Sequence, residues 1–378
     1  MNLRSALLSA KAGTTIRLSA GASQDAALHQ PLDIARPRVT LTSANPSSPP
    51  SLGLYGSTIR VHPTIPVLFS GIQLAPGLVF DVQDGASVEL LGVLLDHLAY
   101  LANSTGAQIA ISNVRTARAW DTTAAIYLAG KNAKLTMTNV SIVDQHDNFR
   151  IQVTGVNNTV SQIGSTLSSI AQSGPCMVIE RSDTSLSVAS SVFDNCWANY
   201  GSGGGGLKFT GYRNTAVFSS STMTNNGGVG IPGIGGGGFL QFQGTQGSVS
   251  FESCVLGVTG YNMIILGFGG SVHVSGAGTN LSFVRSSVAN SLNINGAGSG
   301  LYFNGAQLLV EASNFSGNGA SRGDGGGIYA ITTLPLKVWK ATRRARPPAA
   351  RPSSRGARCS KTPPPPATEP GWTRKGAP

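Results

Sequence analysis

The residues most able to do chemistry in this chain lie in Asp144-Gln-His146-Asp147. Asp144 and His146 are two positions apart, so on a strand they would share one face. A carboxylate in that position could orient the imidazole as a general base, which would suit a polysaccharide lyase or hydrolase. The competing interpretation, which we favour, is a solvated loop that opens a polar segment.

Other catalytic and metal sites are harder to build from this sequence. Residues 1–336 contain 15 Asp and Glu, widely scattered, whereas calcium takes about six to eight oxygen ligands. No Cys or His spacing resembles a zinc site. We therefore expect no metal and no cofactor. His273 has no evident partner and reads as a surface or turn residue.

The cysteines and the Asn-x-Ser/Thr glycosylation acceptors bear on whether the protein is secreted or intracellular. Cys176 and Cys196 are 20 residues apart, a spacing that suits neighbouring rungs of a repeat. Cys254 stands where other repeats carry serine, which predicts a small packed residue, and the disulfide state is left open. The five glycosylation acceptors are Asn103, Asn139, Asn157, Asn280 and Asn314.

The elements that would position any catalytic or binding side chain are copies of an eight-residue block with apolar residues at positions 1, 3 and 8. Its copies begin 30, 33, 32 and 27 residues apart, at Leu186, Ala216, Val249, Leu281 and Leu308. Self-similarity at such a period marks a repeat architecture. The alternation places positions 1 and 3 on one face of a strand, and their polar neighbours, such as Ser187 and Ser282, on the other.

A second signal, Leu-x-Phe-x-Gly, precedes the block. Its copies are Leu207–Gly211, Leu240–Gly244, Leu266–Gly270 and Leu301–Gly305. Alternation predicts that its phenylalanines, Phe209, Phe242, Phe268 and Phe303, are core residues. The outward partners Tyr302 and Tyr329 are then the expected sugar contacts.

Copies of the same strand in a fixed order predict an all-β fold: a right-handed, single-stranded parallel β-helix. An antiparallel sandwich with Asn-Gly hairpins, such as Asn226-Gly227, is the alternative. Residues 3–10 have helical spacing and would cap the first rung.

We place the β-helix at 1–334, with irregular rungs over 14–130, an insertion at about 145–175 and regular rungs over about 180–330. Residues 335–378 are rich in Pro and Arg, which predicts a disordered tail. We interpret this tail as an artefact of gene prediction. The alternative is a genuine basic tail that binds an anionic polymer.

The charge of the chain is concentrated in this tail. Residues 1–336 carry a net charge of +1, and residues 337–378 carry +10. A folded body without a basic face is not expected to bind nucleic acid. The longest apolar stretch, Val88–Ala102, contains acidic residues and falls short of the ~20 residues of a membrane span.

Short motifs carry a resemblance to known proteins. Gly205-Gly-Leu207, Gly237-Gly-Phe239, Gly326-Gly-Ile328 and Phe315-Ser-Gly-Asn318 are similar to the repeats of chlamydial polymorphic outer membrane proteins and related β-helix proteins of the pectin-lyase-like superfamily. The resemblance covers roughly 180–330. It implies a β-helix that is exposed at a surface or secreted, and adhesive. The Asn-Thr-Asp, Asp-Asp, Gly-His-Gly and Arg-Ile-Lys motifs of β-helix polygalacturonases do not occur.

We therefore expect a non-enzymatic, extracellular or cell-surface protein with an adhesion, matrix or carbohydrate-contact role. The N-terminus lacks a signal peptide, and we expect the true start to lie upstream. The alternative is a polysaccharide-active enzyme of the pectin-lyase-like class, with its site near 144–175.

Overall fold

The computed structural model describes residues 3–338, with gaps. The gaps are 20–30, 46, 53–56, 75–77, 96–104, 117–124, 144–149, 169–174, 199–203, 229–235, 258–261, 266–267, 295, 321–325 and 333–336. The chain divides into Met1–Ala341 and Thr342–Pro378. The second unit, and with it the predicted tail from 339 onward, lies outside the described residues.

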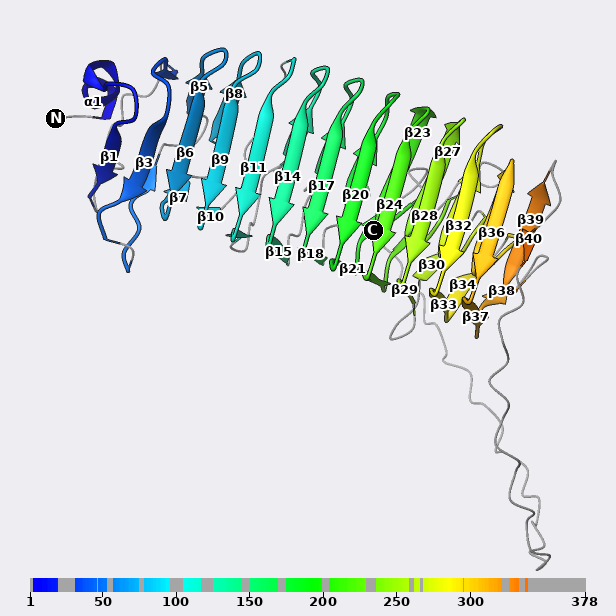
Figure 1. Cartoon of the computed structure of the whole chain (residues 1–378). Helices are drawn as coiled ribbons and strands as arrows, with labels where there is room; N and C mark the ends of the chain where they lie inside the picture. Colours follow the sequence, from blue (N-terminus) through cyan, green and yellow to red (C-terminus); the bar gives the residue numbers. More distant parts are fainter. Residues whose placement is uncertain are drawn as a thin grey trace, which may run out of the picture. The chain divides into compact units, whose positions relative to one another are not determined.

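The described residues of the first unit are all-β except for one short helix, and their strands form long parallel sheets in a solenoid-like stack (Figure 1). The longest, sheet A, comprises β1 (Thr15–Leu18), β3 (Val39–Ser43), β6 (Pro66–Ser70), β9 (Ser87–Leu91), β11 (Gln108–Ser112), β14 (Lys134–Thr138), β17 (Thr159–Ile163), β20 (Ser185–Ala189), β24 (Thr215–Ser219), β28 (Ser248–Glu252), β32 (Asn280–Val284), β36 (Gln307–Glu311) and β40 (Lys337–Val338).

Where its strands are described, sheet B precedes sheet A within a rung, and it has two parts. The first is β2 (Leu32–Ile34), β5 (Thr58–Val61) and β8 (Val79–Val82); the second is β13 (Ala125–Leu128), β16 (Arg150–Val153), β19 (Met177–Ile179), β23 (Leu207–Tyr212), β27 (Leu240–Thr245), β31 (Val272–Ser275), β35 (Leu301–Gly305) and β39 (Ile328–Thr332).

Sheet C follows sheet A from the rung of β3 to the rung of β36, and a smaller sheet D follows sheet C in later rungs. Sheet C comprises β4 (Ser51–Leu52), β7 (Gln73–Leu74), β10 (Leu94–Leu95), β12 (Arg115–Thr116), β15 (Ser141–Val143), β18 (Thr166–Ser168), β21 (Val192–Asp194), β25 (Thr222–Thr224), β29 (Val255–Leu256), β33 (Ser287–Ala289) and β37 (Asn314–Ser316). Sheet D comprises β22 (Trp197–Ala198), β26 (Gly227–Gly228), β30 (Asn262–Ile264), β34 (Ser291–Asn293) and β38 (Gly319–Ala320).

The eight-residue blocks stack in register, as predicted. Their first positions pair from strand to strand in sheet A, from Leu186 with Ala216 to Leu281 with Leu308. Their eighth positions pair in sheet C, beginning with Phe193 and Met223. Parallel pairing throughout rules out the antiparallel sandwich for the described residues.

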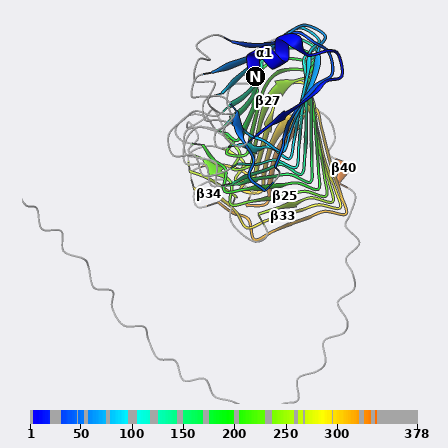
Figure 2. The same ribbon diagram turned by 90° about the vertical axis from the view of Figure 1, so that its left-hand side faces the viewer.

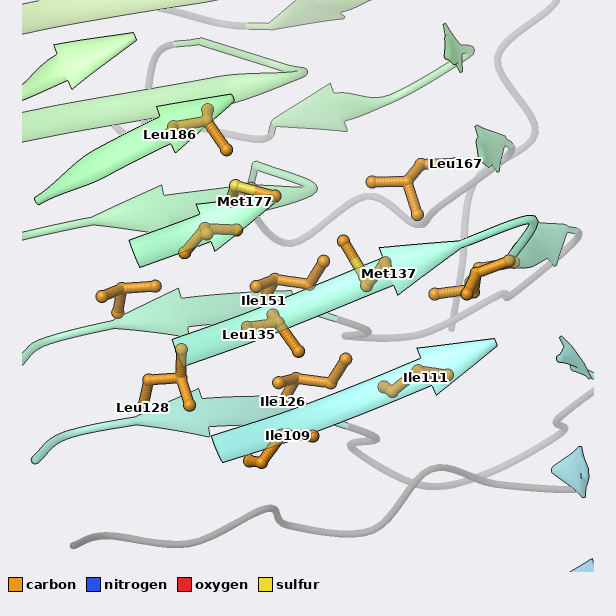
Figure 3. Close-up of a cluster of buried hydrophobic side chains, with 14 of the residues drawn as sticks. Ile109, Ile111, Ile126, Leu128, Leu135, Met137, Ile151, Leu167, Met177 and Leu186 are labelled. Carbon is orange, nitrogen blue, oxygen red and sulfur yellow. The ribbon is translucent and has the colours of Figure 1, made fainter. Parts of the chain in front are cut away.

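The core lies between the sheets and consists of the alternating apolar residues of successive rungs (Figure 3). Phe218, Phe251 and Phe283 stack with ring centroids 4.8 Å apart at each step. This distance matches the separation of neighbouring strands, about 4.8 Å. Each aromatic pair adds about 0.5–1.5 kcal/mol beyond its buried area.

The helix α1 (Leu3–Ser9) confirms the predicted N-terminal helix. It begins before the first strand of sheet A and lies at the end of the stack that faces the viewer in Figure 2. Leu3 and Leu7, one turn apart, are buried in the same core as the strands. The helix therefore covers apolar side chains that the first rung would otherwise expose.

A serine ladder holds the corner between sheets A and C. Each serine hydroxyl donates to the carbonyl two residues earlier at 2.7–3.0 Å. Each also accepts the backbone N–H of the preceding rung at 3.0–3.2 Å. The ladder consists of Ser165, Ser191, Ser221, Ser286 and Ser313. Cys254 takes the remaining place and is buried, as the sequence predicts.

The Gly-Gly and Phe-x-x-Asn motifs also have structural explanations. A Cβ on Gly205 would lie 2.1 Å from the carbonyl oxygen of Gly227. The Asn226 side chain donates to the Phe193 carbonyl and accepts the Cys196 N–H. The Asn318 side chain makes the same two bonds to the preceding rung: it donates to the Val288 carbonyl and accepts the Ser291 N–H. These motifs thus let rungs approach closely and satisfy buried backbone groups.

One copy of the second signal was placed wrongly by the sequence. In register, Val272 and Val274 occupy the positions of Leu240 and Phe242, not Leu266 and Phe268. Phe268 is only half-buried and lies outside the core. The deciding feature is Gly269 at φ +73°, three residues before the strand, just as Gly298 precedes Leu301.

The predicted insertion at 145–175 is wrong, because β16, β17 and β18 form a complete rung there. Polar residues hid the alternation from the sequence. Gln162 and Asn158 occupy inward positions and are almost fully buried. The solenoid also extends past the predicted end at 334, since β40 pairs with β36.

Cys176 and Cys196 form a disulfide. Cys176 precedes β19, and Cys196 lies between β21 and β22, so the bond links the start and the end of one rung. The expectation that these cysteines sit on neighbouring rungs is therefore wrong. The pairing registers of the two flanking strands place them in the same rung.

The buried amide of Gln162 gives a first prediction. Both of its side-chain polar atoms lack a hydrogen-bond partner among the described residues. An unpaired buried polar group costs about 1–3 kcal/mol. We expect Gln162→Met to raise the free energy of unfolding by about that amount in urea titrations. Gln307→Met, at an exposed position, is the control. A loss of stability in Gln162→Met alone would contradict this account.

The serine ladder gives a second prediction. Ser221→Ala removes the acceptor of the buried Ser191 N–H and should cost about 1–3 kcal/mol of unfolding free energy. Cys254→Ser restores a hydroxyl to the ladder and should leave stability unchanged or raise it by up to about 1 kcal/mol. Urea unfolding midpoints test both. Equal losses from the two substitutions would refute the ladder's contribution.

Candidate binding surfaces

The predicted catalytic residues Asp144, His146 and Asp147 lie outside the described residues, between β15 and β16. Among the described residues, no group of three or more His, Cys, Asp or Glu is arranged to hold a metal. A hollow of about 200 Å³ lies over β3, β6 and β9 and includes Arg38 and Glu89. It is smaller than the ~300–1,000 Å³ of typical ligand pockets.

One group of charged side chains on the described surface pairs across rungs of sheet B. Arg60 donates to Asp81 at 2.9 Å and to Asp33 at 3.4 Å, and His62 contacts Asp33. The hydrogen bond to Asp81, with Asp33 nearby, raises the pKa of Arg60. This arrangement neutralises the guanidinium on both sides, so the cluster reads as a ladder of charges on the outside of sheet B.

A second charged ladder lies at the corner between sheets B and A. Arg213 makes two hydrogen bonds to Asp183, at 2.6 and 2.9 Å, and these lower the pKa of Asp183. The guanidinium also lies over the ring of Tyr212, 4.4 Å from its centroid. Because the Asp183 carboxylate and the Arg213 guanidinium bond each other, neither group of this pair is free to act as a catalytic acid or base.

Four of the five predicted glycosylation acceptors are described, and all four are exposed. Asn139 donates to Asn113, Asn157 donates to Asn132, and Asn314 donates to Ser316. Asn280 makes no such bond within the described part of the chain. Asn103 lies outside the described residues. Glycosylation remains a prediction at all five positions.

His273 is buried, although the sequence suggested a surface residue. It lies on the outward side of sheet B, in register with Gln241 and Tyr302. Its Nδ1 accepts the Gly236 N–H, and its Nε2 bonds the Ser275 hydroxyl at 2.9 Å. Burial lowers its pKa to about 4. The ring is therefore neutral near pH 7 and holds the Gly-rich connection against the sheet.

The predicted sugar contacts Tyr302 and Tyr329 belong to an aromatic stack beside His273. Tyr302 lies between Phe268 and Tyr329, with ring centroids 4.7 and 5.5 Å away and ring planes 21° and 12° apart. Stacking covers both faces of the Tyr302 ring, the surfaces that a sugar would use. Its edge and hydroxyl are what remain for a ligand.

The outer surface of sheet A differs from these clusters. From β11 to β32, seven strands contribute three outward positions each, and twelve of these twenty-one carry a hydroxyl. We call these twelve residues the hydroxyl face. They are Ser112, Thr136, Thr138, Thr159, Ser161, Ser185, Ser187, Thr215, Ser219, Ser248, Ser250 and Ser282.

The hydroxyl face is open and nearly uncharged. Within the described part of the chain, none of its twelve side-chain oxygens bonds another protein group. Lys134 and Glu252 are the two charged residues among the twenty-one positions, and no aromatic residue occurs there. Sequence alternation already placed Ser187 and Ser282 outside. It could not show that the strands align their hydroxyls in columns.

No family model, curated protein or solved structure matches this chain. No helix among the described residues is long and apolar enough to cross a membrane.

His273 gives a third prediction. Its pKa is lowered when folded, so the unfolded chain binds the proton more strongly, and stability falls as pH drops from about 6.5 to about 4. The loss should approach about 3 kcal/mol and level off below that window. His273→Gln should remove this part of the pH dependence in urea titrations. His62→Gln, at an exposed site, should keep it, and an unchanged slope in His273→Gln would contradict the assignment.

Proposed function

We propose that this protein is a non-enzymatic, secreted or cell-surface right-handed parallel β-helix that contacts carbohydrate or extracellular matrix. The handedness rests on the general rule that parallel crossover connections are right-handed in about 98% of cases. The Gly-Gly and Phe-x-x-Asn motifs, which resemble those of chlamydial polymorphic outer membrane proteins, favour the same fold and an adhesive role.

The hydroxyl face is the observation that carries the proposal. Twelve hydroxyls without protein partners lie over seven consecutive strands. A hydroxyl both donates and accepts, so the face suits a neutral, hydrogen-bonding polymer. Catalysis would instead require ionisable groups that converge, and the charged clusters described above are internally paired.

A polysaccharide-active enzyme of the pectin-lyase-like class is the alternative, with Asp144, His146 and Asp147 as its candidates. The disulfide of the rung that begins at Cys176 favours an oxidising compartment for either function. The basic residues of 337–378 are a separate candidate for binding anionic polymers, and salt dependence separates this binding from contact through the neutral face.

A binding experiment tests the proposal. We expect the full-length protein to be retained on immobilised neutral polysaccharide at both low and high salt. A face variant, Ser187→Arg with Ser250→Arg, should lose most of this retention because two large cations enter the centre of the hydroxyl face. A control variant, Thr166→Arg with Ser287→Arg, alters outward hydroxyl residues of sheet C and should bind normally.

Two results would overturn this proposal. Retention that disappears at high salt and ignores the face variant would assign binding to the basic tail. Cleavage of an acidic polysaccharide that Asp144→Ala abolishes would establish the enzyme instead.

A further inference from the structure

The hydroxyl face has a second property, which is its two-dimensional order. Its central column runs through Ala110, Thr136, Ser161, Ser187, Val217, Ser250 and Ser282, each paired in register with the next. Figure 1 shows β11 to β32 side by side and nearly parallel. Side chains of one column therefore repeat at the strand separation, about 4.8 Å, and columns repeat every two residues, about 6.6 Å.

Ordered water has a closely related repeat. Water oxygens joined by O–H···O bonds are about 2.8 Å apart, and tetrahedral bonding then separates second neighbours by about 4.5 Å. The column repeat exceeds this by about 0.3 Å, so a water lattice that matches the middle strand is offset by only about 1 Å at the first and the last of the seven strands. A lattice of hydrogen-bonded water can thus follow the whole column.

The chemistry of the face suits this partner. The backbone groups of β11 to β32 are engaged in the sheet, which holds the outward side chains at fixed spacing. Non-hydroxyl positions include small apolar residues, Ala110, Ala189, Val217 and Val284. Binding to a rigid, preformed surface costs little conformational entropy, and few charges are present to impose another order on the water.

We propose that the hydroxyl face binds the surface of ice. Crystalline polysaccharide also presents a flat lattice, and the experiment below separates the two partners. The inference goes beyond the adhesive role proposed above and does not depend on it.

The test measures ice growth in solutions of the full-length protein. A single ice crystal held just below its melting point should stop growing and become faceted, and ice recrystallisation in a frozen film should be inhibited. Serum albumin at equal concentration sets the baseline. The face variant should lose most of both effects, while the control variant should keep them. Circular dichroism confirms that both variants are folded.

The outcomes are distinct from those of the adhesion experiment. A wild-type protein that behaves like albumin overturns the ice proposal, as does an equal loss of activity in the two variants. Retention on polysaccharide without any effect on ice also overturns it, and leaves the adhesive role standing. Ice activity without polysaccharide retention supports it and removes that role.

Discussion

Every feature of this molecule depends on the in-register hydrogen bonding of parallel strands from one rung to the next. Because the backbone N–H groups of one strand donate to carbonyls of the neighbouring strand in a fixed register, equivalent side chains must stack on one another. Stacking rewards pairs of like residues, which is why Phe218, Phe251 and Phe283 form one column. The same constraint explains the serine ladder, where each hydroxyl satisfies a backbone N–H that the corner would leave unpaired.

This constraint made much of the fold predictable from the sequence. A residue type that recurs at a fixed period must face the same neighbours, so the blocks at Leu186 and Ala216 could be aligned directly. Prediction failed where a rung met the constraint with other residues. Gln162 occupies an inward position that is apolar in other rungs, so the rung of β17 did not show the alternation. Val272 occupies the position that leucine has in the neighbouring rungs, and Leu266 matched the sequence signal without occupying that position. Gly269, with φ at +73°, marks the start of the sheet B strand better than the leucine does, because backbone geometry at a corner varies less than side-chain type.

The surfaces were harder to predict, because their character depends on what lies over them. His273 alternates like an exposed residue, and its contacts with Gly236, Phe268 and Tyr302 bury it. Tyr302 does point outward, as expected, yet its neighbours Phe268 and Tyr329 cover its ring. For Asp144, His146 and Asp147 the sequence offers chemistry, but the described residues do not include them. The alternation along a strand determines which way a side chain points. Whether that side chain is accessible depends on the loops that cross over it, and the path of a loop cannot be read from the repeat.

Charge is distributed in a way that favours an extended binding face over a local site. Like charges cannot stack at the rung spacing without repulsion, and the ion pairs between rungs join opposite charges, such as Asp183 and Arg213, which neutralise each other. Hydroxyls carry no such penalty, and they can repeat in every rung. A solenoid that grows by stacking equivalents therefore accumulates weak, neutral contacts along its length. Its natural partner is one that repeats as well, and binding of that kind strengthens with each rung that remains in register.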